Sequence, residues 1–152
     1  MVVVHPQAGN LGGGGFAVVR FGKEITSLDF RETAPAAARH DMYLDANGKP
    51  IPEASTVGPL ASGIPGSPAG LETLHRRYGD LPWREVVEPA IRLAQDGFEV
   101  SPRLEESIAD EVALLARFPE TAKVWLPDGR PPAAGTTMKL PVLARTLRIY
   151  AE

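Results

Sequence analysis

Residues 16–30 read FAVVRFGKEITSLDF, and this segment carries the strongest structural signal in the chain. Side chains that are β-branched or aromatic fill most positions of 16–21 and 25–30, which is typical of β-strands. Gly22 and Lys23 lie between the two runs and fit a two-residue turn with glycine at its first position. The segment therefore predicts a β-hairpin.

Four consecutive glycines, Gly12 to Gly15, precede this hairpin. A phosphate-binding loop needs Lys-Ser or Lys-Thr after its last glycine, and a dinucleotide-binding loop needs a helix next. Phe16 and a strand follow instead, which argues against phosphate. Two interpretations stay open: close backbone packing that leaves no room for side chains, or backbone that lines a substrate pocket.

Upstream, the apolar run 2–4 predicts a short buried strand directly after Met1, as in a chain with a truncated beginning.

Turn-forming residues are frequent over 39–65, which predicts a long ordered surface connection. After Gly66 the apolar residues follow a helical period. The sequence predicts four helices. The first begins at Ser67-Pro68 and ends before Gly79, and the second begins at Pro82 and ends before Gly97. The third begins at Ser101-Pro102 and ends before Pro119, and the fourth runs from Val142 to about Ala151. We expect Pro89 to kink or break the second helix. The fold class is therefore α+β, a β-hairpin followed by several helices.

The composition is that of an ordinary globular domain, with 43% hydrophobic and 23% charged residues among 152. We expect a single domain over 1–152, incomplete because the last predicted helix reaches the end of the chain. The net charge of -3 and the scattered Lys and Arg exclude a basic face for nucleic acid or an anionic membrane. There is no cysteine, which excludes disulfides, thiolate metal sites and a thiol nucleophile. We find no membrane-spanning run and no signal peptide.

Arg31 lies at the end of the second predicted strand, beside Glu32. A guanidinium can bind a carboxylate through two parallel N–H groups, although an arginine at such a position more often makes a structural ion pair. Asp29 and Asp41 are either partners that orient Arg31 or solvated charges. The sequence offers no clear nucleophile.

The three histidines, His5, His40 and His75, are far apart in the sequence and lack the spacing of metal ligands. His75 falls on the apolar face of its predicted helix, so we expect it to be buried or half-buried. Acidic residues of the third helix are expected to form solvated surface: Glu105, Glu106, Asp110 and Glu111. We predict no metal and no cofactor.

Two long motifs and an ordered series of shorter ones resemble the large subunit of bacterial gamma-glutamyltransferase, also called glutathione hydrolase. The long motifs are VHPQAGNLGGGGF at 4–16 and LDFRETAPA at 28–36. The shorter ones follow in the family's order: DMYLD at 41–45, ASGIPGSPAG at 61–70, YG at 78–79, LAQDGF at 93–98 and LARTL at 143–147. The resemblance covers nearly all 152 positions.

This resemblance implies an N-terminal nucleophile hydrolase of the threonine type with a four-layer α/β/β/α fold. In that family a precursor cleaves itself, and the freed threonine attacks the gamma-glutamyl amide with its own amine as the base. The glutamyl group then passes to water, an amino acid or a peptide. Implied partners are glutathione or other gamma-glutamyl compounds, the remaining large-subunit sequence and the small subunit that bears the threonine. The family is periplasmic or secreted.

The resemblance also assigns a role to Arg31, which matches the arginine that binds the α-carboxylate of the glutamyl group. The nucleophilic threonine of the family begins the small subunit, beyond residue 152, so we expect no catalytic residue in this chain. Thr136 and Thr137 are similar to the paired threonines of the cleavage point, but Met138 follows instead of the family's His-Tyr-Ser, and we reject them as nucleophiles. Two alternatives stay open, a non-catalytic glutamate-binding or assembly module and a truncated frame without activity.

Overall fold

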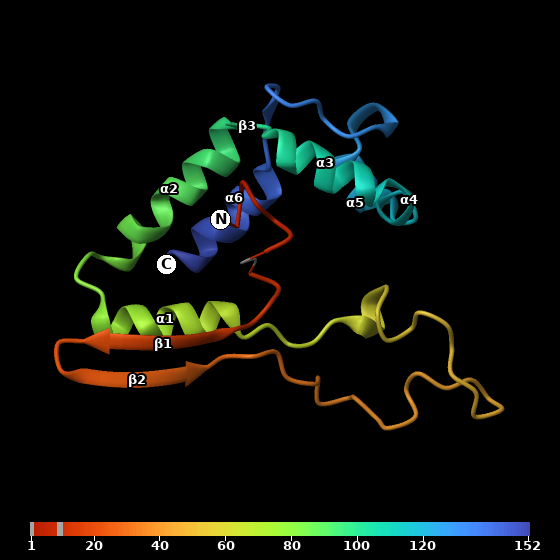
Figure 1. Cartoon of the computed structure of the whole chain (residues 1–152), viewed down its shortest axis with the longest axis horizontal. Helices are drawn as coiled ribbons and strands as arrows, with labels where there is room; N and C mark the ends of the chain where they lie inside the picture. Colours follow the sequence, from red (N-terminus) through yellow and green to blue (C-terminus); the bar gives the residue numbers. More distant parts are fainter. Residues whose placement is uncertain (1, 9–10) are drawn as a thin grey trace. The chain divides into compact units, whose positions relative to one another are not determined.

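The computed structural model describes residues 2–8 and 11–152. It divides into two compact units: the first is 11–78, and the second is 1–10 together with 79–152. The elements of the first unit are β1 (Phe16–Phe21), β2 (Glu24–Asp29), η1 (Pro59–Ala61) and α1 (Ser67–Tyr78). Those of the second are α2 (Trp83–Asp96), β3 (Phe98–Glu99), α3 (Pro102–Asp110), α4 (Val112–Leu115), α5 (Pro119–Trp125), η2 (Pro127–Gly129), β4 (Thr137–Met138) and α6 (Pro141–Tyr150) (Figure 1).

The predicted hairpin is confirmed. β1 pairs antiparallel with β2 in a register that runs from Phe16 opposite Asp29 to Phe21 opposite Glu24. Gly22 has a φ of 61°, the conformation that the first position of this tight turn requires. Phe30 lies beyond the assigned end of β2, yet its N–H still donates to the carbonyl of Gly15 at 2.9 Å. The ladder therefore continues into the glycine run.

Helix α1 begins at Ser67 and ends at Tyr78, as predicted. At its start, the backbone N–H groups of Gly66 and Ser67 both donate to the carbonyl of Gly13, at 3.0 and 2.9 Å. At its end, the Tyr78 ring lies 5.4 Å from the ring of Phe21, centre to centre. The glycine run and the tip of the hairpin therefore hold the two ends of α1.

The stretch 39–65 is the surface connection that the sequence predicts. Its side chains are mostly exposed, and its only helical segment is the short η1. Asp45 orders a turn by accepting the N–H groups of Asn47 and Lys49 with one carboxylate oxygen, at 2.8 and 2.9 Å. Further along, Thr33 and Ile64 form an isolated antiparallel bridge that returns the chain to the end of the hairpin.

The core of the second unit lies between α2 and α6. Side chains from both helices are buried there: Val87, Ile91, Ala94, Ala144 and Leu147. Trp83 joins the same two helices, because its Nε1–H donates to the carbonyl of Tyr150 at 2.7 Å. We expected a kink or a break at Pro89; the break is wrong, since α2 runs through Pro89 from Trp83 to Asp96, and the kink stays a prediction. Proline removes one backbone hydrogen bond of the helix. The burial of apolar side chains on both sides of Pro89 compensates for that loss.

The third predicted helix begins as expected but is divided. Ser101 Oγ accepts the N–H of Leu104 at 3.2 Å, which confirms the predicted cap. The helix then ends at Asp110, because Glu111 leaves the helical region with φ -110° and ψ 11°. Pro119, expected to lie beyond a helix end, instead starts α5, a position that proline tolerates well.

Two further elements differ from the sequence predictions. Residues 2–4 form a turn, not a strand, although Val3 is buried at 1% exposure. The pairing of β3 with β4, with Phe98 opposite Met138, was not predicted. Gly97 makes this pairing possible with a φ of 111°, a backbone conformation that other residues rarely adopt.

Candidate functional site

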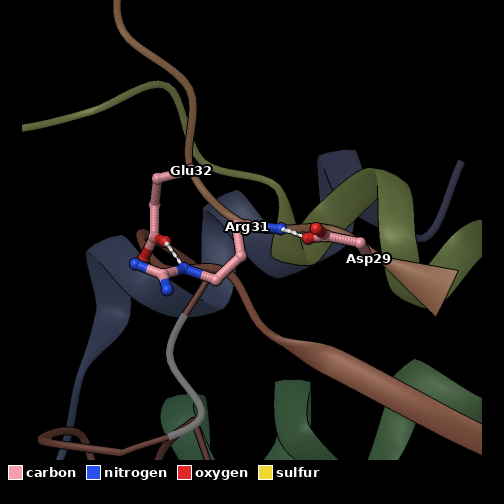
Figure 2. A network of polar contacts seen from close by, with 3 residues as sticks. All are labelled: Asp29, Arg31 and Glu32. Atoms are coloured by element: carbon pink, nitrogen blue, oxygen red, sulfur yellow. Dashed lines mark hydrogen bonds and ion pairs between the residues drawn. The ribbon is translucent and has the colours of Figure 1, made fainter.

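The candidate site is built around Arg31, which directly follows the end of the hairpin ladder. The carboxylate of Asp29 accepts the backbone N–H of Arg31 at 2.9 Å (Figure 2). A bond of this kind, from a side chain to the backbone two residues on, is typical of turns that end a strand. Asp29 therefore sets the direction of the chain at Arg31 and does not bind its guanidinium.

Backbone packing fixes the position of the Phe30–Arg31 peptide. A Cβ placed on Gly14 would lie 2.6 Å from the carbonyl oxygen of Phe30, and one placed on Gly66 would lie 1.9 Å from the same atom. A Cβ on Gly70 would lie 2.3 Å from the Phe30 ring. Such distances are far inside van der Waals contact, so only glycine fits at these positions. Close backbone packing is therefore the observed role of Gly14 in the glycine run, while Gly9 and Asn10 of its lead-in lie outside the described residues.

The guanidinium of Arg31 is oriented by two neighbours. Its Nε lies 3.5 Å from Oε2 of Glu32, and its Cζ lies 5.7 Å from the centre of the Phe16 ring. A cation over an aromatic face at this distance is attracted to the ring. The Arg31 side chain is nevertheless 63% exposed, so a ligand can reach it.

Glu32 carries a carboxylate whose pKa is lowered from its ordinary value. The largest cause is a hydrogen bond from the backbone N–H of Glu32 itself, which favours the charged form. Desolvation opposes the shift, whereas the positive charge of Arg31 and the backbone N–H of Gly14 add to it. Glu32 is therefore a charged partner for Arg31 that the glycine run helps to hold.

The other predicted partner of Arg31 lies elsewhere. Asp41 forms an ion pair with Arg39, with its Oδ1 3.6 Å from Nε. The contribution of Phe16 was not predicted from the sequence; the strand register places Phe16 opposite Asp29 and thus near Arg31. Gly66 and Gly70 were not predicted either, although their four-residue spacing in the GIPGSPAG motif is a signal for them.

The remaining candidates do not join this site. His75 is half-buried, as predicted, on α1. The Thr136 hydroxyl donates to the carbonyl of Ala133 at 2.6 Å, as in an ordinary loop. Glu105, expected to be solvated, accepts the N–H of Ala134 at 2.8 Å and so ties α3 to the loop before β4. Within 2–8 and 11–152, no three metal-binding side chains gather, and no helix is long and apolar enough to cross a membrane.

A separate cavity of about 510 Å³ lies in the second unit, along α2 and the end of α6. Ile91 and Ala151 form its buried part. The charged residues that line it are Arg84, Glu88, Arg92, Arg148 and Glu152. This lining carries arginine and glutamate side chains and no histidine.

Comparison with known proteins gives the context of the Arg31 site. The family model described as gamma-glutamyltranspeptidase matches residues 1–152 of the chain. The chain belongs to the gamma-glutamyltranspeptidase family. Among curated relatives, it is 41% identical to the glutathione hydrolase proenzyme of Escherichia coli K12, over 100% of this chain and 27% of that protein. It is 40% identical to glutathione hydrolase 3 of Arabidopsis thaliana, over 99% of this chain and 23% of that protein.

Solved structures of the family contain the same fold. The gamma-glutamyltranspeptidase of Helicobacter pylori superimposes with a TM-score of 0.94 at 36% identity, over 99% of this chain and 44% of that one. The enzyme of Pseudomonas nitroreducens, in complex with L-DON, gives a TM-score of 0.89 at 38% identity, over 99% and 44%. The resemblance found in the sequence is thus confirmed, and the chain spans about a quarter of the length of the curated relatives that it matches.

Proposed function

We propose that this chain is an N-terminal part of the large subunit of a gamma-glutamyltransferase, or glutathione hydrolase. The whole enzyme cleaves the gamma-glutamyl bond of glutathione and transfers the glutamyl group to water, an amino acid or a peptide. Membership of the family and the names of its curated relatives support this proposal. We also propose that the parent enzyme is periplasmic or secreted.

In this proposal, Arg31 binds the α-carboxylate of the glutamyl group. The observation that carries the assignment is an exposed guanidinium on a peptide that glycine packing holds in place. A planar guanidinium can donate two parallel hydrogen bonds to one carboxylate, which fixes both the position and the direction of the substrate. Holding the donor in one orientation is itself a catalytic contribution.

The group that breaks the bond comes from the rest of the enzyme. We propose that a threonine at the start of the small subunit attacks the gamma-glutamyl carbonyl while its own amine takes the hydroxyl proton. The C–N bond of the gamma-glutamyl amide then breaks, the donor's amine leaves with that proton, and an acyl-enzyme remains. The acceptor then attacks this acyl-enzyme and releases the threonine. The present chain contributes substrate binding and no bond-making atom.

We further propose that the hairpin is part of a larger α/β/β/α sandwich. Its open face supports this, because Phe16, Val18 and Ile25 are 67%, 79% and 70% exposed. Large apolar side chains in adjacent positions of a sheet are typical of a surface that packs against another layer. In the described part of the chain, that sheet has only the strands β1 and β2.

A direct test measures the hydrolysis of a gamma-glutamyl anilide. We expect no activity from this chain alone, and activity once the downstream portion with its threonine is supplied. Turnover by the purified chain alone would contradict the proposal that the nucleophile lies outside it.

A second test replaces Arg31 with lysine in the assembled enzyme. Arg31→Lys keeps the charge but cannot donate two parallel hydrogen bonds to one carboxylate, so we expect KM for the donor to rise by about tenfold or more. Arg39→Lys is the matched control, since Arg39 also pairs with a carboxylate at the surface of the same unit. An unchanged KM in Arg31→Lys would count against the assignment.

The alternative function is a non-catalytic module that binds glutamate or assembles with another subunit. The accessible guanidinium of Arg31 favours it, because such a group can bind a carboxylate without any chemistry. Calorimetric titration of glutamate into the chain separates the two proposals. Saturable heat from the chain alone supports the binding module, whereas its absence supports a pocket completed by the rest of the enzyme.

A further inference from the structure

The register of the hairpin places Phe16 and Arg31 on one face of the sheet. Phe16 lies opposite Asp29. The pairing continues one step further, where Gly15 and Phe30 exchange backbone hydrogen bonds of 3.3 and 2.9 Å. Arg31 comes two residues after Asp29, so it is the diagonal neighbour of Phe16. Diagonal neighbours on one face are close enough for aromatic and long side chains to meet.

A glycine leaves room for this diagonal contact. Gly14 lies across from Arg31, and a Cβ added to Gly14 would be 2.8 Å from the Arg31 Cα. Because this position carries no side chain, the Arg31 side chain can extend toward Phe16. Its Cζ lies over the Phe16 ring, 5.7 Å from the ring centre. At such a distance a guanidinium is attracted to the negative face of the ring.

The Phe16 ring differs from the other groups beside Arg31 because it carries no charge. The carboxylate of Asp29 accepts the Arg31 backbone N–H at 2.9 Å, and that of Glu32 lies 3.5 Å from Nε (Figure 2). A fixed carboxylate repels a second carboxylate that approaches the same guanidinium, whereas a neutral ring does not. Attraction to a ring also depends on no particular N–H group. Phe16 can therefore restrain Arg31 without competing with an anionic ligand.

Exposure of the Arg31 side chain makes such a restraint useful. This side chain is 63% exposed, and a long exposed side chain samples many rotamers. Ordering it when a ligand binds costs conformational entropy. Phe16 has only two side-chain torsion angles, and its backbone belongs to the paired strand β1. The ring is therefore a stiffer group than the guanidinium that it contacts.

We infer that Phe16 is a positioning residue for Arg31: its ring holds the guanidinium in an orientation from which two N–H groups can meet the carboxylate of the donor. The inference rests on the proposed function, in which Arg31 binds that carboxylate. Phe16 acts through Arg31 and not through contact with the substrate. Its effect depends on the electron density of the ring face, because that density attracts the cation.

A role of Phe16 in packing alone makes a different prediction. Phe16, Val18 and Ile25 form the open face of the hairpin, which we propose packs against another layer. If packing were the whole role of Phe16, leucine would replace it well, and its loss would resemble the loss of Val18. Attraction to the ring predicts instead that leucine fails where tyrosine succeeds.

The experiment measures steady-state kinetics of the assembled enzyme with a gamma-glutamyl anilide. We expect Phe16→Leu to raise KM for the donor by about two- to fivefold with little change in kcat, and Phe16→Tyr to keep KM close to that of the parent enzyme. Val18→Ala is the matched control, because Val18 is 79% exposed on the same face of β1, and we expect it to leave KM unchanged.

Fluorinated phenylalanines in place of Phe16 then separate the electrostatics of the ring from its packing. Fluorine withdraws electron density from the ring face with little change in shape, so KM should rise stepwise from phenylalanine through monofluoro- to pentafluorophenylalanine. The inference is overturned if KM does not respond to Phe16→Leu or to fluorination, or if Val18→Ala raises KM as much as Phe16→Leu does.

The variant Arg31→Lys distinguishes a failure of this inference from a failure of the proposed function. If Arg31→Lys raises KM but the Phe16 variants do not, Arg31 still binds the donor and only the role of Phe16 is wrong. If Arg31→Lys also leaves KM unchanged, the proposed function fails as well.

Discussion

Gly66 offers a sharp test of the backbone packing that holds Arg31. In Gly66→Ala the new Cβ would lie 1.9 Å from the carbonyl oxygen of Phe30 and 2.9 Å from that of Arg31. Both are backbone atoms, which no side-chain rotation can move away. Gly66 is not among the glycines with positive φ, so steric contact alone decides the outcome.

The magnitude follows from how far the two segments must separate. Ordinary contact begins at about 3.4 Å, so they must move apart by roughly 1.5 Å. Overpacking of this kind costs about 1–3 kcal/mol, and the movement also weakens the bonds from the Gly66 and Ser67 N–H groups to Gly13, each worth about 1 kcal/mol. We expect Gly66→Ala to lower the free energy of unfolding by about 3 kcal/mol.

Urea unfolding followed by circular dichroism measures this loss. Gly48→Ala is the matched control, since Gly48 has a φ of 73° but nothing within 4 Å of an added Cβ, and we expect it to cost about 1 kcal/mol. Gly63→Ala gives an intermediate case, with its nearest contact at 3.0 Å to Glu32 Cβ. The reasoning is refuted if Gly66→Ala loses no more stability than Gly48→Ala.

Three further predictions concern other parts of the chain. Ser101→Ala removes a helix cap and should cost about 1 kcal/mol in the same urea assay, whereas Ser101→Asp should retain stability; equal values for both would argue against the cap. Trp83→Phe removes the hydrogen bond to the Tyr150 carbonyl and should lower the free energy of unfolding by about 1 kcal/mol, and no change would mean that this bond contributes nothing. Hydrogen bonds to the Asp45 carboxylate, chiefly from the Lys49 N–H, lower the pKa of Asp45 in the folded state. The stability that this carboxylate gives to the folded state is therefore complete above the unfolded-state pKa of about 3.9, and it is lost as pH falls through the lower folded-state pKa. An NMR titration of Asp45 should show this low pKa together with weaker protection of the Lys49 amide, relative to its intrinsic exchange rate, in acid, and an ordinary pKa would disprove the assignment.

Local signals explain which elements could be predicted from the sequence. The hairpin depends on neighbouring strands and a turn at Gly22, all within one short stretch. The starts of α1 and α3 follow from Ser-Pro pairs, which supply a capping side chain and a preset φ. These features need no information from distant parts of the chain.

The elements that were missed depend on contacts between distant residues. Phe98 pairs with Met138, so neither short strand shows a pattern of its own in the sequence. The continuous helix through Pro89 likewise reflects burial against α6, which outweighs the local signal for a break. The third predicted helix is interrupted at Glu111. The sequence gives no sign of this interruption, because the position is neither a glycine nor a proline.

The same distinction applies to the candidate site. Arg31 and its neighbour Glu32 could be singled out because they are adjacent in the sequence, and their ion pair was among the interpretations of the pattern. Phe16 and Gly66 reach the same place only through strand pairing and the return of the chain along the Thr33–Ile64 bridge. Composition and periodicity do not encode that convergence.

The glycine contacts around Phe30 have a consequence for engineering this protein. Main-chain atoms set the location of the Arg31 backbone, whereas the side chains of Phe16 and Glu32 orient its guanidinium. Libraries designed on the proposed function should therefore leave Gly14, Gly66 and Gly70, as well as Phe16 and Glu32, untouched and diversify other exposed positions around them.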